Sequence, residues 1–352
     1  MKKVGIVTII SQNNGNRLQN YALQEVIKRF DCSSYTIPIV SYEGKQSLLK
    51  ITIKQYLALF FKRYQFVFWD MFNQRINWNK HAVKDMSLDE IQSFDYFIAG
   101  SDQIWNPLFN INSDREFLVF AEKKQRIAYA ASIGLSNLPE EYKSRYNRNL
   151  NGIPFISVRE KEAAEIVKNL IGREVQVVLD PTMLLTTKEW DKVINYSRLK
   201  INKKYVLKYI LGDFSEECNA YIEKQVKENN LEIIDIETYS NKNGIKLGPC
   251  EFLYLIKNSR MVFTDSFHAT IFSILFHKQF VVFNRAEEEG YGEMSSRLNT
   301  LLNMFNLEEN KIKGDDREIL FDNSIDYSSI DIILESKRKE SYSYLEKILK
   351  SK

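Results

Sequence analysis

The second half of the chain alternates short apolar runs with amphipathic stretches, and this alternation limits the fold more than any other feature. Apolar runs of this length, bounded by polar or glycine-bearing turns, predict buried strands. The expected strands are 205–211, 231–236, 261–264 and 280–283, and the expected helices are 216–229, 251–258, 270–276 and 295–305. Regular strand–helix alternation is typical of a parallel sheet covered by helices.

The first half follows the same order less regularly. Residues 4–10 form a β-branched run, as in a buried parallel strand, and a polar loop through Arg17 leads into a helix with one apolar face. Further strands are expected at 96–99, 127–131, 155–158 and 175–179. Because 352 residues exceed one ordinary core, we expect an α/β fold of two Rossmann-like domains with parallel sheets facing a cleft.

The expected division places the N-terminal domain at 1–185 and the C-terminal domain at 186–325. A charged amphipathic helix within 326–352 is expected to pack back across both domains. An aromatic stretch at 48–72 lies in a helical insertion, 48–80, and its interspersed charges prevent it from spanning a bilayer. Packing on the protein itself or on another subunit is preferred to contact with a membrane interface.

Composition narrows the class of protein. The chain is 44% hydrophobic and 27% charged, which is typical of a soluble globular protein, and a net charge of +3 gives no nucleic-acid signature. Its three scattered cysteines have no CxxC spacing, which argues for a reducing compartment and against a disulfide framework or zinc site. The N-terminal apolar run breaks at Ser11, too early for a signal peptide. We expect a cytoplasmic protein.

The junction between the expected strand 261–264 and the next helix carries the strongest chemical signal. Free backbone N–H groups gather at such a helix start and attract anions. His268 lies there, unlike His81 and His277. Ser266 is a candidate N-cap, and Asp265 a candidate to orient the imidazole. The pattern indicates acid–base chemistry on a phosphorylated or carboxylated substrate, although a histidine bonded within the core has the same sequence context.

A second polar turn, Gly100-Ser101-Asp102-Gln103-Ile104-Trp105, follows the expected strand 96–99. Asp102 could accept a proton from a hydroxyl group, and Trp105 could stack on the face of a sugar. The alternatives are an N-cap for Asp102 and core packing for Trp105.

Cationic and backbone groups near the other turns complete the set of candidates. Arg159 could pair with a carboxylate or phosphate, although arginines in Arg-Glu-Lys-Glu runs are usually solvated. Arg297 is another candidate anion contact at a helix start. Asn14-Gly15-Asn16 at the first turn could present backbone N–H groups to a ligand, but the segment lacks the full dinucleotide-binding glycine pattern.

In chain order, these segments resemble the polysaccharide pyruvyl transferase family. The segments are Leu18-Gln19-Asn20-Tyr21-Ala22-Leu23-Gln24, Gly100-Ser101-Asp102-Gln103-Ile104-Trp105, Ser157-Val158-Arg159-Glu160, Asp180-Pro181-Thr182, Thr264-Asp265-Ser266-Phe267-His268 and Arg297-Leu298. The match extends from about Val4 to Leu307 and implies a GT-B-like fold. It also implies phosphoenolpyruvate as donor, without a further cofactor or metal, and a sugar or lipid-linked oligosaccharide of a capsule or exopolysaccharide precursor as acceptor. Such an acceptor would bring the protein to the inner face of the membrane.

For this reaction, His268 is the candidate for acid–base work or for a hydrogen bond to the phosphate, and Asp102 is the candidate base toward the acceptor hydroxyl. Arg159, Arg297, Ser266 and Ser101 are candidate substrate contacts. The N-terminal domain is expected on the acceptor side and the C-terminal domain on the donor side. Many relatives have Arg-Leu-His where this chain has Ser266-Phe267-His268, so Arg159, Arg297 or Lys161 must supply the missing charge. Ala269 also replaces the glycine usual after the histidine. We expect His268→Ala and Arg159→Ala to lose most turnover while the protein stays folded.

Two other functions fit the same sequence. One is a GT-B-type glycosyltransferase with a nucleotide-sugar donor, and the other is a noncatalytic glycan-binding subunit of a polysaccharide assembly complex.

Overall fold

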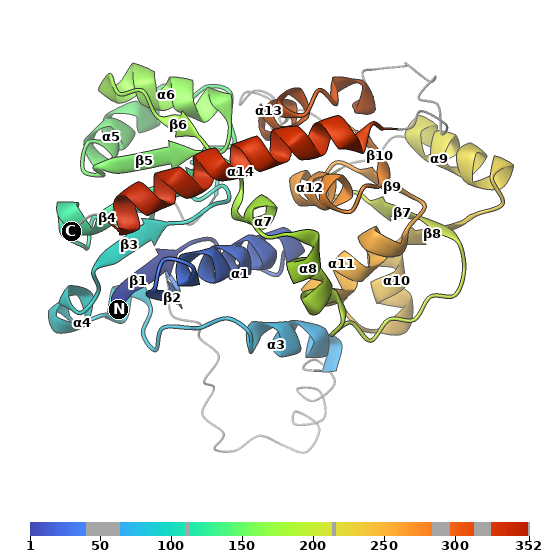
Figure 1. Ribbon diagram of the computed structural model, residues 1–352, viewed down its shortest axis with the longest axis horizontal. Coiled ribbons are helices and arrows are strands. Elements are labelled where there is room, and N and C mark those ends of the chain that lie inside the picture. The colour runs from blue at the N-terminus through green and yellow to red at the C-terminus, as the bar shows by residue number, and fades with distance from the viewer. Residues whose placement is uncertain (40–63, 110–112, 213–215, 284–295, 313–324, 351–352) are drawn as a thin grey trace.

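Two parallel β-sheets, each covered by helices, form the protein (Figure 1). The computed structural model describes residues 1–39, 64–109, 113–212, 216–283, 296–312 and 325–350. All described strand pairs are parallel. This is the architecture that strand–helix alternation predicted, and the α/β fold class is confirmed.

The N-terminal half contains a six-stranded sheet with the order β2-β1-β3-β4-β5-β6. Its strands are β1 (Lys2–Val7), β2 (Cys32–Ile37), β3 (Tyr96–Ala99), β4 (Arg126–Ala131), β5 (Phe155–Val158) and β6 (Gln176–Val177). Its helices are α1 (Asn14–Lys28), α3 (Val67–Asn73), α4 (Leu88–Gln92), α5 (Glu140–Leu150) and α6 (Lys161–Ile171), with short 3-10 helices at Val83–Asp85, Asp114–Phe117 and Lys123–Gln125.

The C-terminal half contains a four-stranded sheet with the order β10-β9-β7-β8. Two helices, α7 (Pro181–Leu184) and α8 (Thr187–Ile194), carry the chain from the first sheet to the second. The strands are β7 (Tyr205–Tyr209), β8 (Glu232–Asp235), β9 (Met261–Thr264) and β10 (Gln279–Val282). The helices are α9 (Glu216–Glu228), α10 (Ile236–Asn243), α11 (Pro249–Asn258), α12 (Phe267–Leu275), α13 (Ser296–Met304) and, after a 3-10 turn at Glu308–Asn310, α14 (Tyr327–Leu349).

Each sheet has one place where the strand order reverses, and ligands of open α/β sheets bind at such places. In the first sheet the reversal lies between β1 and β3, and in the second it lies between β7 and β9. The loops that leave β1, β3 and β9 carry the polar turns that the sequence singled out. The topology therefore predicts a ligand site at the carboxyl ends of these strands.

Strand β2 and the bounds of several other elements differ from the sequence expectation. Strand β2 was not predicted, because Ser34 and Thr36 lie on its buried side, where the pattern requires apolar residues. The Thr36 hydroxyl accepts a hydrogen bond from Gln24 and donates one to Asn20, both on α1. Helix α1 starts at Asn14 rather than after Arg17, and α12 starts at Phe267 rather than Thr270.

The described part of the aromatic segment packs on the C-terminal half. In α3, Trp69 and Phe72 are buried, and the Trp69 indole N–H donates to the backbone oxygen of Leu247 at 3.1 Å. The expected insertion from residue 48 to residue 63 lies outside the described residues. For α3, packing against the protein's own helix α11 agrees with the interpretation preferred from sequence.

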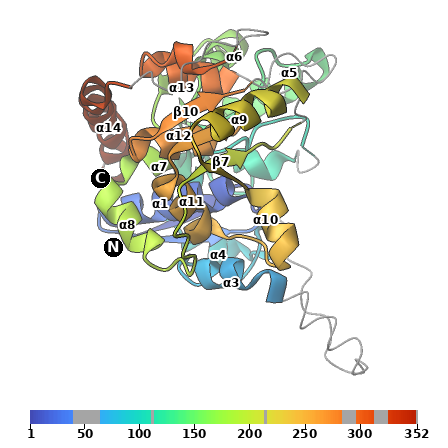
Figure 2. The same cartoon turned by 90° about the vertical axis from the view of Figure 1, so that its right-hand side faces the viewer.

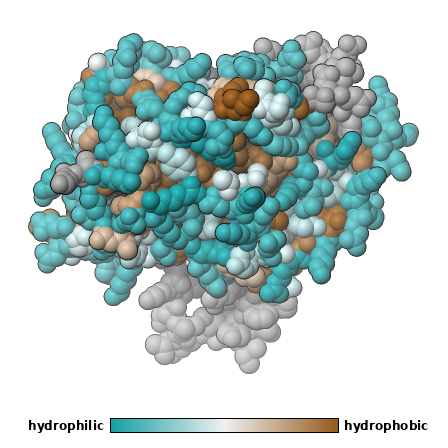
Figure 3. Space-filling view, viewed as in Figure 1, coloured by the Kyte–Doolittle hydropathy of each residue, from teal (hydrophilic) through white to brown (hydrophobic). Residues whose placement is uncertain are grey.

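Helix α14 crosses the outside of both halves (Figures 1 and 2). Near its start the Tyr327 hydroxyl bonds to the backbone oxygen of Lys278, and near its end the Tyr344 hydroxyl donates to the backbone oxygen of Ala128. The face that α14 crosses is mostly hydrophilic, with apolar residues in separate spots (Figure 3). Isolated exposed apolar residues are normal on a folded protein.

Removing the Arg338 side chain should weaken the attachment of α14. Arg338 is buried and donates to the backbone oxygens of Met183 at 2.6 Å and Leu185 at 2.8 Å. Arg338→Leu removes a charged donor from both oxygens, so we expect a loss of roughly 2–3 kcal/mol in the free energy of unfolding. Urea denaturation measures the loss. The exposed neighbour offers a control, Lys339→Ala, which should change stability by less than about 0.5 kcal/mol.

Candidate active site

A buried ion cluster lies at the carboxyl end of the first sheet. The guanidinium of Arg159, just after β5, donates to Asp180 at 2.8 Å, to Asp102 at 3.0 Å and to the Ser101 hydroxyl at 3.2 Å. Its side chain is 1% exposed. One cation thus faces two carboxylates in an interior where unpaired charge is costly. Arg159 is not on a solvated helix face, and its terminal nitrogens are engaged by the protein's own groups.

Asp180 connects the cluster to both halves, and it was not among the site residues predicted from the sequence. Its Oδ1 caps α7 by accepting the N–H of Thr182 at 3.0 Å, and its Oδ2 accepts the Ser101 hydroxyl at 2.6 Å. Burial alone would raise the pKa of Asp180, but His268, Arg159 and Ser101 together hold it well below its ordinary value. The motif Asp180-Pro181-Thr182 was the available signal, since Asp before Pro is a common helix start.

His268 reaches this cluster from the C-terminal half. It is the second residue of α12, and Ser266 is the N-cap, as predicted, accepting the N–H of Ala269 at 3.4 Å. The imidazole is 6% exposed, and its Nε2 lies 3.8 Å from Asp180 Oδ2. Among the residues that the structure describes, no hydrogen-bond partner satisfies this nitrogen. A buried nitrogen that lacks a partner is suited to a ligand or a transferable proton.

Asp265 was expected to orient the His268 imidazole, but its carboxylate bonds to a neighbouring loop. Its two carboxylate oxygens accept the backbone N–H groups of Leu211 and Gly212, each at 2.8 Å. These bonds fix the loop after β7 next to the loop after β9. The carboxylate that forms the ion pair with His268 is Asp180. Asp265 was suggested because it lies close to His268 in the sequence. The fold instead brings Asp180 to the imidazole, from 88 positions before His268.

Asp102 has a backbone conformation that is unusual for a residue other than glycine. Its φ is 82°, in the left-handed region, where aspartate is tolerated better than most residues. Oδ1 accepts from Arg159 and from the N–H of Gln103 at 2.8 Å. Oδ2 is buried without a hydrogen-bond partner in the described part of the chain. Asp102 therefore caps no described helix, and one oxygen remains for a hydroxyl donor.

Arg297 approaches the site from α13. Its guanidinium carbon lies 5.8 Å from the centre of the Phe267 ring, while that of Arg159 lies 4.5 Å from the same ring. With its carboxamide oxygen turned toward Arg297, Gln103 accepts from both terminal nitrogens at 3.2 Å. Phe267 and Gln103 thus bring a second arginine close to the ion cluster.

The segment Asn14-Gly15-Asn16 was expected to be a loop. It forms the first turn of α1 instead, and Asn13 caps this helix. All three residues are buried, and the Oδ1 atom of Asn14 has no described partner. Gly15 lies directly against the His268 ring. The first turn of the N-terminal half and the histidine of the C-terminal half therefore meet in one place.

Trp105 belongs to the core. It is 1% exposed, its ring stacks on Phe117 at 5.4 Å with an interplanar angle of 6°, and its N–H donates to the backbone oxygen of Glu116 at 3.1 Å. Stacking on a sugar would need an open ring face, which this position does not offer. Trp105 therefore packs in the core, which was the alternative to stacking on a sugar.

Glu160 provides a test of the electrostatics around the cluster. It is fully buried, its Oε1 accepts the N–H groups of Ile133 and Gly134 at 2.9 and 3.1 Å, and burial raises its pKa above the ordinary 4.5 despite the nearby Arg159. Its folded-state pKa is raised, so its contribution to stability is present at low pH and is lost as pH rises through that pKa.

Glu160→Gln removes this loss while keeping the shape of the side chain. As pH rises above about 4.5, the wild type should lose unfolding free energy relative to Glu160→Gln. A pKa raised by one gives a relative loss of about 1.4 kcal/mol. Urea titrations between pH 4 and 8 measure the difference. A difference that does not change with pH would contradict a raised pKa.

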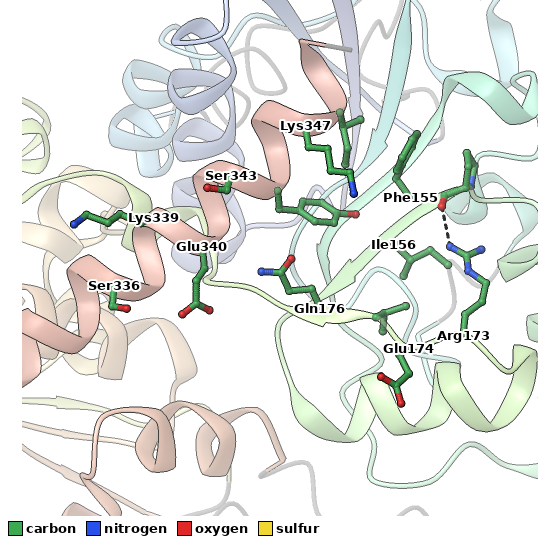
Figure 4. Close-up of a pocket in the computed structure, with 14 residues that line it drawn as sticks. Phe155, Ile156, Arg173, Glu174, Gln176, Ser336, Lys339, Glu340, Ser343 and Lys347 are labelled. Atoms are coloured by element: carbon green, nitrogen blue, oxygen red, sulfur yellow. Dashed lines mark hydrogen bonds between the residues drawn. The ribbon is translucent and has the colours of Figure 1, made fainter. Parts of the chain in front are cut away.

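An open groove of about 740 Å³ lies elsewhere, between α14 and strands β5 and β6 (Figure 4). Its lining includes Arg173, Gln176, Lys339 and Lys347 but no residue of the ion cluster. The Arg173 guanidinium already donates to the backbone oxygens of Ile153 and Pro154, each at 2.8 Å. The groove therefore offers less directed chemistry than the buried cluster, where we place the site.

The described ranges contain neither a candidate metal site nor a helix that could span a membrane. No cluster of three or more His, Cys, Asp or Glu residues there could hold a metal ion. No described helix combines the length and the apolar character needed to cross a bilayer.

Two parallel sheets with a polar site between their carboxyl ends define a GT-B-like α/β protein. Among solved structures, the UDP-GlcNAc 2-epimerase of Methanocaldococcus jannaschii matches with a TM-score of 0.53 at 14% identity, covering 99% of each chain. A putative UDP-N-acetylglucosamine 2-epimerase from Listeria monocytogenes matches at 0.47 and 11%, covering 97% of each. A glycosyltransferase from Rickettsia africae matches at 0.46 and 12%, covering 99% of this chain and 96% of that one.

The family model described as polysaccharide pyruvyl transferase matches residues 13–287. The chain therefore belongs to the polysaccharide pyruvyl transferase family, as the motifs predicted, and it is a transferase of polysaccharide biosynthesis. No curated protein matches the sequence significantly.

Proposed function

We propose that this transferase moves the pyruvyl group of phosphoenolpyruvate onto two hydroxyls of a sugar in a cell-surface polysaccharide precursor. One observation carries the proposal beyond family membership. The cluster around Arg159 and Asp180 holds two buried atoms that have no described hydrogen-bond partner, Nε2 of His268 and Oδ2 of Asp102. A proton donor and a proton acceptor fixed in one cluster suit a reaction that protonates carbon and deprotonates a hydroxyl.

The proposed reaction starts when His268 protonates the methylene carbon of the donor, so that positive charge develops at the neighbouring carbon. One sugar hydroxyl adds to that carbon and gives its proton to Asp102. The carbon–oxygen bond to phosphate breaks, and the second hydroxyl closes the ring and returns a proton to His268. The proton on Asp102 leaves with phosphate, which balances the reaction to a cyclic ketal and inorganic phosphate.

Arg297 is the favoured cation for the donor's carboxylate and phosphate. Arg159 is held by Asp102 and Asp180, and Lys161 is exposed at the start of α6. Arg297 is 8% exposed and lies over Phe267, the residue before His268. An arginine can bind both groups through paired hydrogen bonds. Ser101 in this proposal supports Asp180 rather than the substrate.

The test combines binding with product analysis. Phosphoenolpyruvate should raise the melting temperature, and incubation with lipid-linked sugars should release phosphate and give a product heavier by one pyruvyl ketal in mass spectrometry. Stabilisation by nucleotide sugars alone would support a glycosyltransferase instead. Acceptor binding without donor binding or turnover would support a glycan-binding subunit. A lipid-linked acceptor would place the reaction at the inner face of the membrane.

A further inference from the structure

Gly15 occupies a position where glycine is unfavourable. It is the second residue of α1, a 15-residue helix, and it is buried. Its φ is outside the left-handed region, so the backbone does not require glycine there. Alanine has the higher helix propensity at such a position. The absence of a side chain therefore has another cause than local structure.

The space that a side chain would fill is occupied by His268. A methyl group built on Gly15 would lie within 2.8 Å of three ring atoms, Nδ1, Cγ and Cε1. Separations of this size do not occur between real atoms, and the ring belongs to a packed element. The His268 imidazole therefore lies directly on the α-carbon of Gly15.

Gly15 is one of the described contacts that fix this ring. The Nε2 atom lies 3.8 Å from Asp180, and the Phe267 ring meets the imidazole edge-to-face at 5.4 Å between centroids. Gly15 comes from the N-terminal half and His268 from the C-terminal half. We propose that Gly15 is a positioning residue, which provides the flat surface that holds His268 in its catalytic orientation when the two halves are packed together. The catalytic part of this inference rests on the proposed function.

A double-mutant cycle tests the contact without any substrate. Gly15→Ala should lower the melting temperature of the wild type by several degrees because the methyl group displaces the imidazole. In a His268→Ala background the same change should leave the melting temperature unchanged or raise it, because the obstacle is gone and alanine favours the helix. An equal decrease in both backgrounds would overturn the proposal.

Gly248→Ala is the matched control. A methyl group there would lie 2.9 Å from a backbone atom of Phe68, so the glycine is similarly obstructed, but by a different element. Its effect should be the same with and without His268. If Gly15→Ala does not fold, recovery of the folded state in Gly15→Ala/His268→Ala supports the proposal, and failure of the double variant to fold overturns it.

Nuclear magnetic resonance gives a second readout, since the chain has three histidines. Gly15→Ala should shift the imidazole signals of His268 while those of His81 and His277 stay in place. Unchanged signals from all three would contradict the proposal.

Kinetics give a third readout. With an active acceptor, Gly15→Ala should lower kcat at least about tenfold with little change in KM for phosphoenolpyruvate. Absence of pyruvyl transfer in the wild type would refute the proposed function, yet the cycle would still measure the contact.

Discussion

Arg159→Ala is expected to destabilise the protein by about 3–5 kcal/mol, because it leaves Asp102 and Asp180 buried without their cation. From the sequence alone, this variant was expected to lose turnover while staying folded. The structure changes that expectation, since the side chain is 1% exposed and bonds to three groups. Urea denaturation of the purified variant, followed by circular dichroism, measures the loss.

Arg148→Ala provides the comparison for Arg159. Arg148 also pairs with a carboxylate, Asp114 at 3.3 Å, but its side chain is 69% exposed. Exposed pairs contribute about 1 kcal/mol or less, so this variant should remain close to wild type. Similar losses for the two variants would show that the Arg159 cluster is not the stabilising feature described above.

His268→Ala is expected to lower kcat for pyruvyl transfer by about 10²–10⁴-fold, the usual contribution of a positioned acid or base. Its Nε2 makes one ion pair, with Asp180 at 3.8 Å, and no described hydrogen bond. Arg159 bonds to three groups, so the melting temperature should change less in His268→Ala than in Arg159→Ala. Phosphate release with saturating donor and acceptor measures kcat.

The chain offers two matched controls for His268. His277 pairs with Asp331 at 3.0 Å and is 48% exposed, and His81 pairs with Glu90 at 2.8 Å and is 44% exposed. Replacement of either by alanine should leave kcat within about twofold of wild type, since surface changes away from a site have small effects. Wild-type turnover in His268→Ala would exclude the imidazole from the reaction.

The strands could be predicted because continuous apolar runs distinguish buried parallel strands. Strands β3, β5 and β9 have the predicted bounds, and Ser266 caps α12 as its position suggested. Asp180 could not be assigned to the site, because its partner Ser101 lies 79 positions away and only folding brings the two together. The burial of Arg159 was equally hidden, since a run of charged residues is usually solvated.

Polar residues that are buried account for the other differences. Asn14 and Asn16 indicated a loop by composition, but they form the first turn of α1 within the interior. Trp105 indicated a sugar platform by its place beside Asp102, but its neighbour across the core is Phe117. In both cases the deciding partners come from elsewhere in the chain, and local propensity carries no information about them.

Helix α14 is bonded to both halves of the protein. Its 23 residues span about 35 Å, at 1.5 Å per residue. One end is bonded beside β10 through Tyr327, the middle to α7 through Arg338, and the other end to β4 through Tyr344. A helix bonded at both ends and in the middle resists separation of the two halves along its length. Any opening between the halves is therefore expected on the side opposite α14.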